Sequence, residues 1–347
     1  MTGFNPNDPG VANGGYFALP YKLEDSEIVV ISAPWDVTTS YGAGTHKGPE
    51  AIIDASVQVD LFDSAVEKAW ETRIGTHPID EKIVKLNKRS RKIAEHVIEK
   101  LEEGVSAREL SKELDEVYKA SAILNDYVYE TTKGYIEKGA ITAVVGGEHS
   151  VPLGHYKALG EKYEEYGILH IDAHADLRVA YEGFTYSHAS IMFNALNEVQ
   201  QISQLTQVAV RDYCQQESVF IDNNPRIRCF TDRELARNSF EGKSWKKQCD
   251  EIISSLPENV YISLDIDGLS PEYCPGTGTP VPGGLSYNQL EYLLHSLALS
   301  SKKIIGFDLC EVSPSEESEW DANVGARLLY KLCLFTKLNR NREREVK

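Results

Sequence analysis

Acidic residues and histidines recur at alternate positions in two short segments of this chain, a spacing that suits metal binding. The first segment, DAHAD, holds Asp172, His174 and Asp176, and the second, DID, holds Asp265 and Asp267. Alternate residues of extended backbone point to the same side, so each segment can direct its side chains into one small volume. Carboxylates held so close together repel each other and are costly to bury unless a cation lies between them. The two segments therefore indicate a site for divalent metal.

A further histidine, His149, follows two glycines in the motif GGEHS. The glycines permit a tight turn that holds the ring at the end of the preceding apolar segment. On its own, His149 would also fit a structural role. Beside the two acidic segments it completes a set of candidate metal ligands: His149, Asp172, His174, Asp176, Asp265 and Asp267. His170 shares the alternating spacing but lies inside an apolar run, so we interpret it as a core residue.

The size and chemistry of this ligand set indicate two ions. Four carboxylates and two imidazoles are too many for one catalytic ion that must keep an open coordination position. Oxygen and nitrogen donors without thiolate favour Mn²⁺ and could hold Ni²⁺, Co²⁺ or Zn²⁺, whereas a Mg²⁺ or Ca²⁺ site would not need two histidines. Two neighbouring ions can share a water molecule, lower its pKa and direct a hydroxide at an electrophilic carbon.

Two other residues could act on a substrate beside such a site. The apolar run at 303–309 leads to Asp308 and Glu311, and a carboxylate such as Glu311 can pair with a planar cation through both oxygens. His188, in YSHAS, could transfer a proton near neutral pH. Taken alone, Glu311 would also fit a solvated loop acid and His188 a surface histidine. The loop PGTGTP at 275–280 is suited to forming a wall of the site.

Seven short apolar runs could position these residues, at 28–31, 141–145, 167–171, 207–210, 226–230, 260–264 and 303–309. They are mostly apolar rather than alternating, and helix-length polar segments separate many of them, which is typical of a parallel sheet covered on both faces. The sequence therefore predicts an α/β fold, a three-layer α/β/α sandwich with a mostly parallel central sheet. Because the carboxyl ends of parallel strands meet at one edge, we expect the motifs to converge there.

A charged segment at about 80–138 interrupts this pattern. Its apolar residues between 110 and 128 recur at helical spacing, and Ser106 with Glu109 matches a capping box. The segment is thus predicted to be a helical insertion of two long helices with a break near Gly104, in a supporting or subunit-contact role.

The remaining parts of the chain show no internal repeat and no linker rich in Pro, Gly or Ser. We therefore expect a single domain spanning 1–347, with an N-terminal extension at 1–25. The tail at 338–347 mixes charges without apolar periodicity and is expected to be a frayed, solvated end.

The composition restricts the partners of the protein. The formal charge is −17, which suits a small cationic substrate and neither nucleic acid nor an anionic membrane surface. No run approaches the roughly 18 apolar residues of a membrane span, and the N-terminal sequence does not resemble a signal peptide, so a cytoplasmic location is expected. The six cysteines lie far apart without CxxC, as expected for reduced thiols.

The ordered motifs GGEHS, DAHAD, YSHAS, SLDIDGLSPEYCPGTGTPVPGGLS and GFDLCEVSP resemble the ureohydrolases: arginase, agmatinase, formimidoylglutamase and relatives. The resemblance runs from about Ser32 to Phe335, interrupted by the insertion, and five motifs in order make it highly specific. It implies binuclear metal-dependent hydrolysis of a guanidino C–N bond, releasing urea and an amine or ammonia. It also implies a homo-oligomer, either a trimer or a hexamer.

The resemblance assigns roles to individual residues. One ion would be held by His149, Asp172, Asp176 and Asp265, and the other by His174, Asp172, Asp265 and Asp267. The hydroxide that bridges the ions would attack the guanidinium carbon. Glu311 would orient the guanidinium, and His188 would pass a proton to the leaving nitrogen. On this basis the candidate catalytic residues are His188, Asp176 and Glu311.

The substrate is left open between an agmatine-like guanidino compound and free guanidine. The stretch from DAHAD to YSHAS resembles agmatinases and lacks the pattern by which arginases hold an amino-acid head group, so arginase or formimidoylglutamase activity is the alternative. Trp35, the Thr38-Thr39 pair, Trp320 and the long insertion look more like the subgroup that includes nickel-dependent guanidine hydrolases. Thr38 and Trp320 therefore join Glu311 and His188 as candidates for substrate binding, and bulky aromatics could shorten the pocket.

A non-catalytic family member with a regulatory role is the alternative of another class. It is disfavoured because every candidate ligand, together with His188 and Glu311, is present. A related deacetylase with a single zinc is also disfavoured, because the chain offers two ligand sets. Bound metal and urea release would distinguish these possibilities.

Overall fold

The computed structural model describes residues 4–346, and within them the chain forms one sheet of eight strands, all paired in parallel. The strands lie in the order β2-β1-β3-β8-β7-β4-β5-β6. Their bounds are β1 Ile28–Ala33, β2 Ile74–His77, β3 Ile141–Gly146, β4 Tyr166–Ile171, β5 Ile202–Val208, β6 Ile227–Phe230, β7 Asn259–Asp265 and β8 Lys303–Cys310. The predicted parallel sheet is confirmed.

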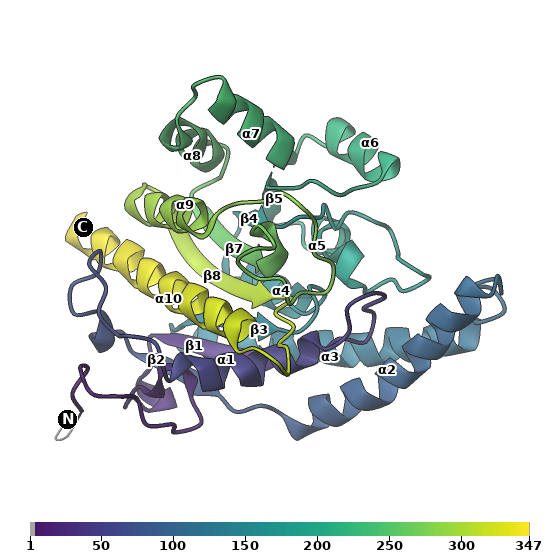
Figure 1. The fold of residues 1–347 in the computed structure, drawn as a ribbon, viewed down its shortest axis with the longest axis horizontal. Coiled ribbons are helices and arrows are strands. Elements are labelled where there is room, and N and C mark those ends of the chain that lie inside the picture. The colour runs from purple at the N-terminus through teal and green to yellow at the C-terminus, as the bar shows by residue number, and fades with distance from the viewer. Residues whose placement is uncertain (1–3, 347) are drawn as a thin grey trace.

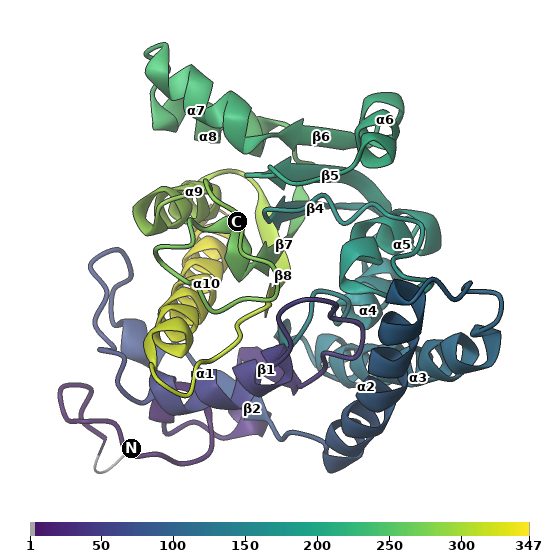
Figure 2. The same cartoon turned by 45° about the vertical axis from the view of Figure 1, so that its right-hand side comes forward.

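Helices cover both faces of this sheet, as Figures 1 and 2 show. One layer contains α1 (Gly48–Ser56), α7 (Asp232–Phe240), α8 (Trp245–Ser254), α9 (Tyr287–Leu299) and α10 (Trp320–Val346). The other contains α2 (Glu81–Glu102), α3 (Ser111–Glu137), α4 (Leu153–Lys162) and α5 (Ile191–Glu198). Helix α6 (Gln215–Asn223) lies near the β6 edge. This is the three-layer sandwich that the sequence predicts.

Strand side chains alternate between the two cores because successive residues of a strand point to opposite faces. In β4, Ile168 packs with the α4 and α5 residues, whereas Leu169 and Ile171 pack with the residues of α8, α9 and α10. Both faces are buried, so the strand reads as an uninterrupted apolar run. This double burial is why the sequence predicts most of the strands.

The predicted insertion contains the long helices α2 and α3, and the chain turns between them at Gly104, where a φ of +89° suits glycine. The expected start of the second helix is wrong. Helix α3 begins at Ser111. Glu109 Oε1 accepts from the Ser106 N–H at 3.3 Å, as in a capping box, and also from the Ser106 hydroxyl at 2.6 Å, and these bonds close a local turn ahead of the helix.

The structure differs from the sequence-based expectations in three other places. The sequence does not predict strand β2, because its segment IGTH carries one large apolar side chain and the strand pairs only with β1 at the sheet edge. The strand expected at 207–210 begins earlier, at Ile202, and ends at Val208. The tail expected to fray from 338 instead continues α10 to Val346, with Lys347 outside the described residues.

Asn339 explains why the start of this tail is held. Its side-chain amide donates to Ala298 O and Lys302 O, at 3.1 and 2.8 Å, and its oxygen accepts from Ile304 N–H at 2.9 Å. These bonds join α10 to β8 through one buried polar residue, which an analysis of apolar periodicity does not detect.

Part of the N-terminal extension expected at 1–25 packs on the core, and residues 1–3 fall outside the described part. Tyr16 and Phe17 are buried in the core, and the Tyr16 hydroxyl lies 2.8 Å from Ser32 Oγ. No helix within 4–346 is both long and apolar enough to cross a membrane.

Candidate metal centre

The candidate site lies at the carboxyl ends of four adjacent strands, β3, β8, β7 and β4. His149 follows β3 and the DAHAD motif follows β4. Asp265 ends β7 and Glu311 comes directly after β8. Because all four strands run in parallel, their ends deliver these side chains to the same edge of the sheet, as predicted.

Two groups of contacts form at this edge. In the first, His149 Nδ1 lies 3.0 Å from Asp172 Oδ2, 3.5 Å from Asp176 Oδ2 and 3.3 Å from Asp265 Oδ2. In the second, His174 Nδ1 lies 3.4 Å from Asp172 Oδ1 and 3.1 Å from Asp267 Oδ2. Asp172 contributes one oxygen to each group, and Asp265 Oδ1 accepts the backbone N–H of Asp267. All six candidate ligands are therefore brought together.

The electrostatics of the cluster suit a cation. Burial, together with the neighbouring acids, raises the pKa of Asp265 and of Asp176 well above the usual range. Burial also acts to raise the pKa of Asp172, but the surrounding histidines hold it well below that range. Burial acts to lower the pKa of His149, and its acidic partners raise it above the usual value. Four buried carboxylates around two imidazoles therefore fit divalent ions, which neutralise the acids without protonating them.

Buried polar side chains contact the metal-ligand candidates His149 and Asp172 from within the sheet. His149 Nε2 lies 2.8 Å from Ser263 Oγ, which donates to Asp308 Oδ1 at 3.2 Å and lies 2.9 Å from the Tyr156 hydroxyl. His170 is buried, as its interpretation as core requires, and its Nε2 also lies 2.9 Å from Asp172 Oδ2. Apolar periodicity does not predict these supporting contacts, although the alternating spacing that His170 shares is a detectable signal.

Glu311 presents a buried acceptor next to the metal ligands. Its Oε1 accepts the backbone N–H of His149 at 2.8 Å, while no group within residues 4–346 hydrogen-bonds to its Oε2. Burial and the acids Asp265 and Glu148 raise the pKa of this carboxyl well above its usual range. The backbone φ of Glu311 is +65°, a strained value for a residue with a side chain. Glu311 therefore combines a buried, unpartnered carboxyl oxygen with a strained backbone.

Thr38 connects His188 to a second buried acid. Its N–H and hydroxyl donate to Glu148 at 2.7 and 2.9 Å, and its Oγ1 lies 3.4 Å from His188 Nδ1. Burial raises the pKa of Glu148 to about 7. Burial, with a further contribution from His174, lowers the pKa of His188 to about 4, so its ring is neutral at pH 7.

A small cavity of about 130 Å³ opens beside the ligands. His174, Asp176 and His188 line it, together with groups from several loops. Of the described residues, neither Thr38 nor Trp320 belongs to its lining. Trp320 is 51% exposed at the start of α10.

The other aromatic residue noted in the sequence, Trp35, also lies apart from this cavity. It is fully buried in the core beside α2 and α3. The structure therefore brings His188 to the cavity but neither Trp35 nor Trp320.

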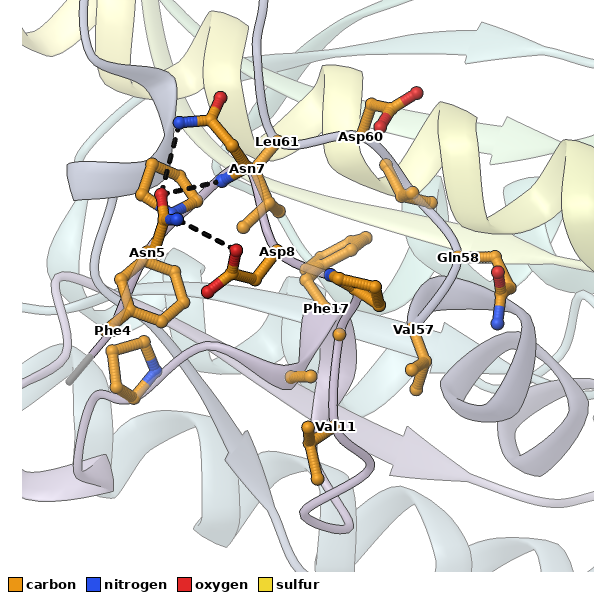
Figure 3. A pocket seen from close by; sticks show the side chains of 16 residues that line it. Phe4, Asn5, Asn7, Asp8, Val11, Phe17, Val57, Gln58, Asp60 and Leu61 are labelled. Atoms are coloured by element: carbon orange, nitrogen blue, oxygen red, sulfur yellow. Dashed lines mark hydrogen bonds between the residues drawn. The ribbon is translucent and has the colours of Figure 1, made fainter.

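A larger cavity, of about 810 Å³, lies apart from this edge, between the N-terminal segment and residues 57–61 (Figure 3). Its charged lining residues are Asp8 and Asp60, without a histidine or a cysteine. It therefore lacks the donor set of the metal centre.

Comparison with known proteins gives consistent results. A sequence model described as the Arginase family matches residues 26–335. The N(1)-aminopropylagmatine ureohydrolase of Thermus thermophilus is 30% identical over 315 residues, which cover 90% of each chain. The agmatinase of Bacillus subtilis is 26% identical over 320 residues, covering 92% of this chain and 95% of the other. The crystal structure of the agmatine ureohydrolase of Thermoplasma volcanium has a TM-score of 0.69 at 22% identity, and the match covers 92% of each chain. The matched region includes every candidate metal ligand.

Proposed function

This chain belongs to the arginase family, and from that premise we propose that it is a ureohydrolase that cleaves a guanidino C–N bond with water. The products are urea and an amine, or urea and ammonia when the substrate is free guanidine. The substrate class is a small cationic guanidino compound, either agmatine-like or guanidine itself.

The observation that carries this proposal is the unpaired Oε2 of Glu311. A buried carboxylate oxygen without a partner is costly unless a cation approaches it, and a guanidinium offers planar N–H donors that match a carboxylate. Glu311 is bonded to the backbone of the metal ligand His149, so a guanidinium held by Oε2 lies next to the metal ligands.

Each residue of the site has a separate role in the proposed reaction. Glu311 orients the guanidinium, and His188, whose ring is neutral at pH 7, takes the proton that the attacking water loses and passes it to the leaving nitrogen. Asp176 acts as a ligand beside the attacked carbon. Two divalent ions bound by the six ligands supply the chemistry of a water molecule with a lowered pKa. Thr38 acts on this site through Glu148 and His188, while a contact of Trp320 with substrate stays a prediction.

Urea release by the purified protein tests the proposal. The protein is reloaded separately with Mn²⁺ and Ni²⁺ and given guanidine, agmatine, 4-guanidinobutyrate and arginine in parallel. Release of urea from at least one guanidino substrate, dependent on added metal, supports the proposal. A protein that binds two metals but releases urea from none of them contradicts it and favours a non-catalytic role.

The finer properties rest on the family and on the donor chemistry. The mixed oxygen and nitrogen donors favour Mn²⁺ or Ni²⁺ as the two ions. We further propose a single domain that assembles into a homotrimer or homohexamer in the cytoplasm. Light scattering on the purified protein measures the mass of the assembly.

A further inference from the structure

The helical insertion contacts a loop that carries one of the site's polar residues. Helices α2 and α3 lie side by side, and α3 packs against α4 on the same face of the sheet (Figure 2). Asn87 and Arg91 are four residues apart on α2, so they lie on the same face of the helix. Both side chains reach the loop at 36–39, which follows β1.

Asn87 forms a reciprocal pair with Asp36. Its side-chain oxygen accepts the Asp36 N–H at 2.9 Å, and its amide donates to Asp36 Oδ1 at 3.1 Å. Asn87 is buried, and Asp36 is buried as well. Two hydrogen bonds to one residue fix both the backbone and the side chain at the start of the loop.

Arg91 satisfies the carbonyl groups of the same loop. Its Nη1 lies 3.2 Å from Asp36 O and 3.3 Å from Val37 O, and it also donates to Thr39 O. Its Nε donates to Glu95 Oε1 at 3.0 Å, which orients the guanidinium. The Arg91 side chain is only 16% exposed. The Arg91 guanidinium therefore binds backbone carbonyl groups on both sides of Thr38.

Thr38 is the residue that this arrangement presents to the site. Besides its two bonds to Glu148, its Oγ1 accepts the His188 N–H at 3.3 Å. Helix α3 braces the segment on the other side, because Tyr118 stacks on Tyr186 with ring centroids 5.1 Å apart. His188 thus lies in one loop and contacts the other, and the insertion contacts both loops.

We propose that Arg91 and Asn87 are positioning residues of the hydrolase, which act through Thr38 to hold His188 and Glu148 in place. The inference rests on the proposed function. Small displacements of a proton-transfer group or of its supports lower turnover while leaving ground-state binding largely intact. The insertion then has a role in the reaction as well as in packing.

Arg91→Met tests the proposal, because it removes the guanidinium and keeps an aliphatic stem that still covers the core. Arg89→Met is the matched control, since Arg89 is exposed on the same helix. Hydrogen–deuterium exchange over 34–41 and 181–190, kcat, KM and metal content are measured for each. The expected result for Arg91→Met is faster exchange in both segments, a fall in kcat of about tenfold or more, a KM within about threefold of wild type and unchanged metal content.

The pair Thr38→Ala and Thr38→Ala/Arg91→Met tests whether Arg91 acts through Thr38. If it does, the double variant is no more than about threefold slower than the slower single variant, because the second change removes an effect already lost. Defects in kcat that multiply would overturn the proposal. So would Arg91→Met behaving like Arg89→Met in exchange and turnover, or losing metal in proportion to activity.

The exchange measurement separates this inference from the proposed function. If the wild-type protein releases urea from no guanidino substrate, the proposed function fails. Exchange over 34–41 still reports whether Arg91 holds the loop, and unchanged exchange in Arg91→Met overturns the inference on its own.

Discussion

Replacing Glu311 with glutamine directly tests the carboxylate to which we assign the guanidinium. Glu311→Gln preserves the size of the side chain and one oxygen that can accept the His149 N–H. It places an NH₂ group where the unpaired Oε2 stood. A guanidinium has only N–H donors, so it would meet a donor in place of a carboxylate oxygen.

The size of the effect follows from the burial of this carboxylate, which is 5% exposed. Removing one partner of a buried, hydrogen-bonded charge pair costs about 2–5 kcal/mol. Since about 1.4 kcal/mol corresponds to a factor of ten, kcat/KM is expected to fall by about 30-fold to about 4,000-fold. Metal binding should be unchanged, because Glu311 bonds to the backbone of His149 and not to its ring.

The assay is urea release with the best substrate of the panel, accompanied by elemental analysis of bound metal. Glu316→Gln serves as the control, because it makes the same chemical change at an exposed position nearby. A Glu311→Gln protein that keeps its metal and a kcat/KM within about threefold of the control would refute the reasoning. The guanidinium would then bind elsewhere.

A metal ligand, a helical glycine and a buried histidine give further predictions. Asp265→Asn is expected to lose more than roughly half of the bound metal, because the Asp265 carboxylate lies 3.3 Å from His149 Nδ1. His188→Asn should keep its metal and slow turnover. Elemental analysis that shows the reverse for the two variants would contradict these roles. Gly134→Ala should raise the free energy of unfolding by about 0.5–1 kcal/mol, since the residue lies inside α3 and an added Cβ meets nothing within 4 Å. Denaturant titration checks the sign. Burial lowers the pKa of His155 from 6.5 to about 3. As the pH falls below about 6.5, the unfolded chain therefore binds a proton that the folded protein excludes. The free energy of unfolding then falls by about 1.4 kcal/mol per pH unit. His155→Gln should remove this slope between about pH 6 and pH 4.5, and parallel stability curves for the two proteins would show that His155 is not the cause.

Much of the sheet could be predicted because its strands are buried on both faces. A strand such as β4 must be apolar at every position, and that requirement leaves a clear pattern in the sequence. Strand β2 pairs on one side only and carries Gly, Thr and His, so it leaves no such pattern. The start of the tail is held by Asn339, whose hydrogen bonds reach residues far away in the sequence.

The metal ligands could be predicted for a related reason. A parallel sheet fixes where the ends of its strands lie, so a motif that follows a strand is placed once the strand is recognised. Residues that orient the ligands carry a weaker signal, such as the alternating spacing that His170 shares with the ligands. Ser263 and Asp308 support His149 from within β7 and β8, and their polar side chains look like exceptions in otherwise apolar strands.

The loops around the site are positioned by contacts between residues far apart in the sequence. Thr38 lies 110 residues from Glu148 and 150 from His188, and contacts at such separation depend on how the insertion packs. The positive φ of Glu311 likewise depends on its surroundings, where its N–H bonds to Gly147 O and its Oε2 lies 2.8 Å from the position a Cβ would take at Gly278. The sheet therefore determines the ligand cluster, while loops held by distant residues determine the shape of the pocket around it. Variants of these loops are therefore expected to change which guanidino compound is cleaved while the bound metal stays unchanged.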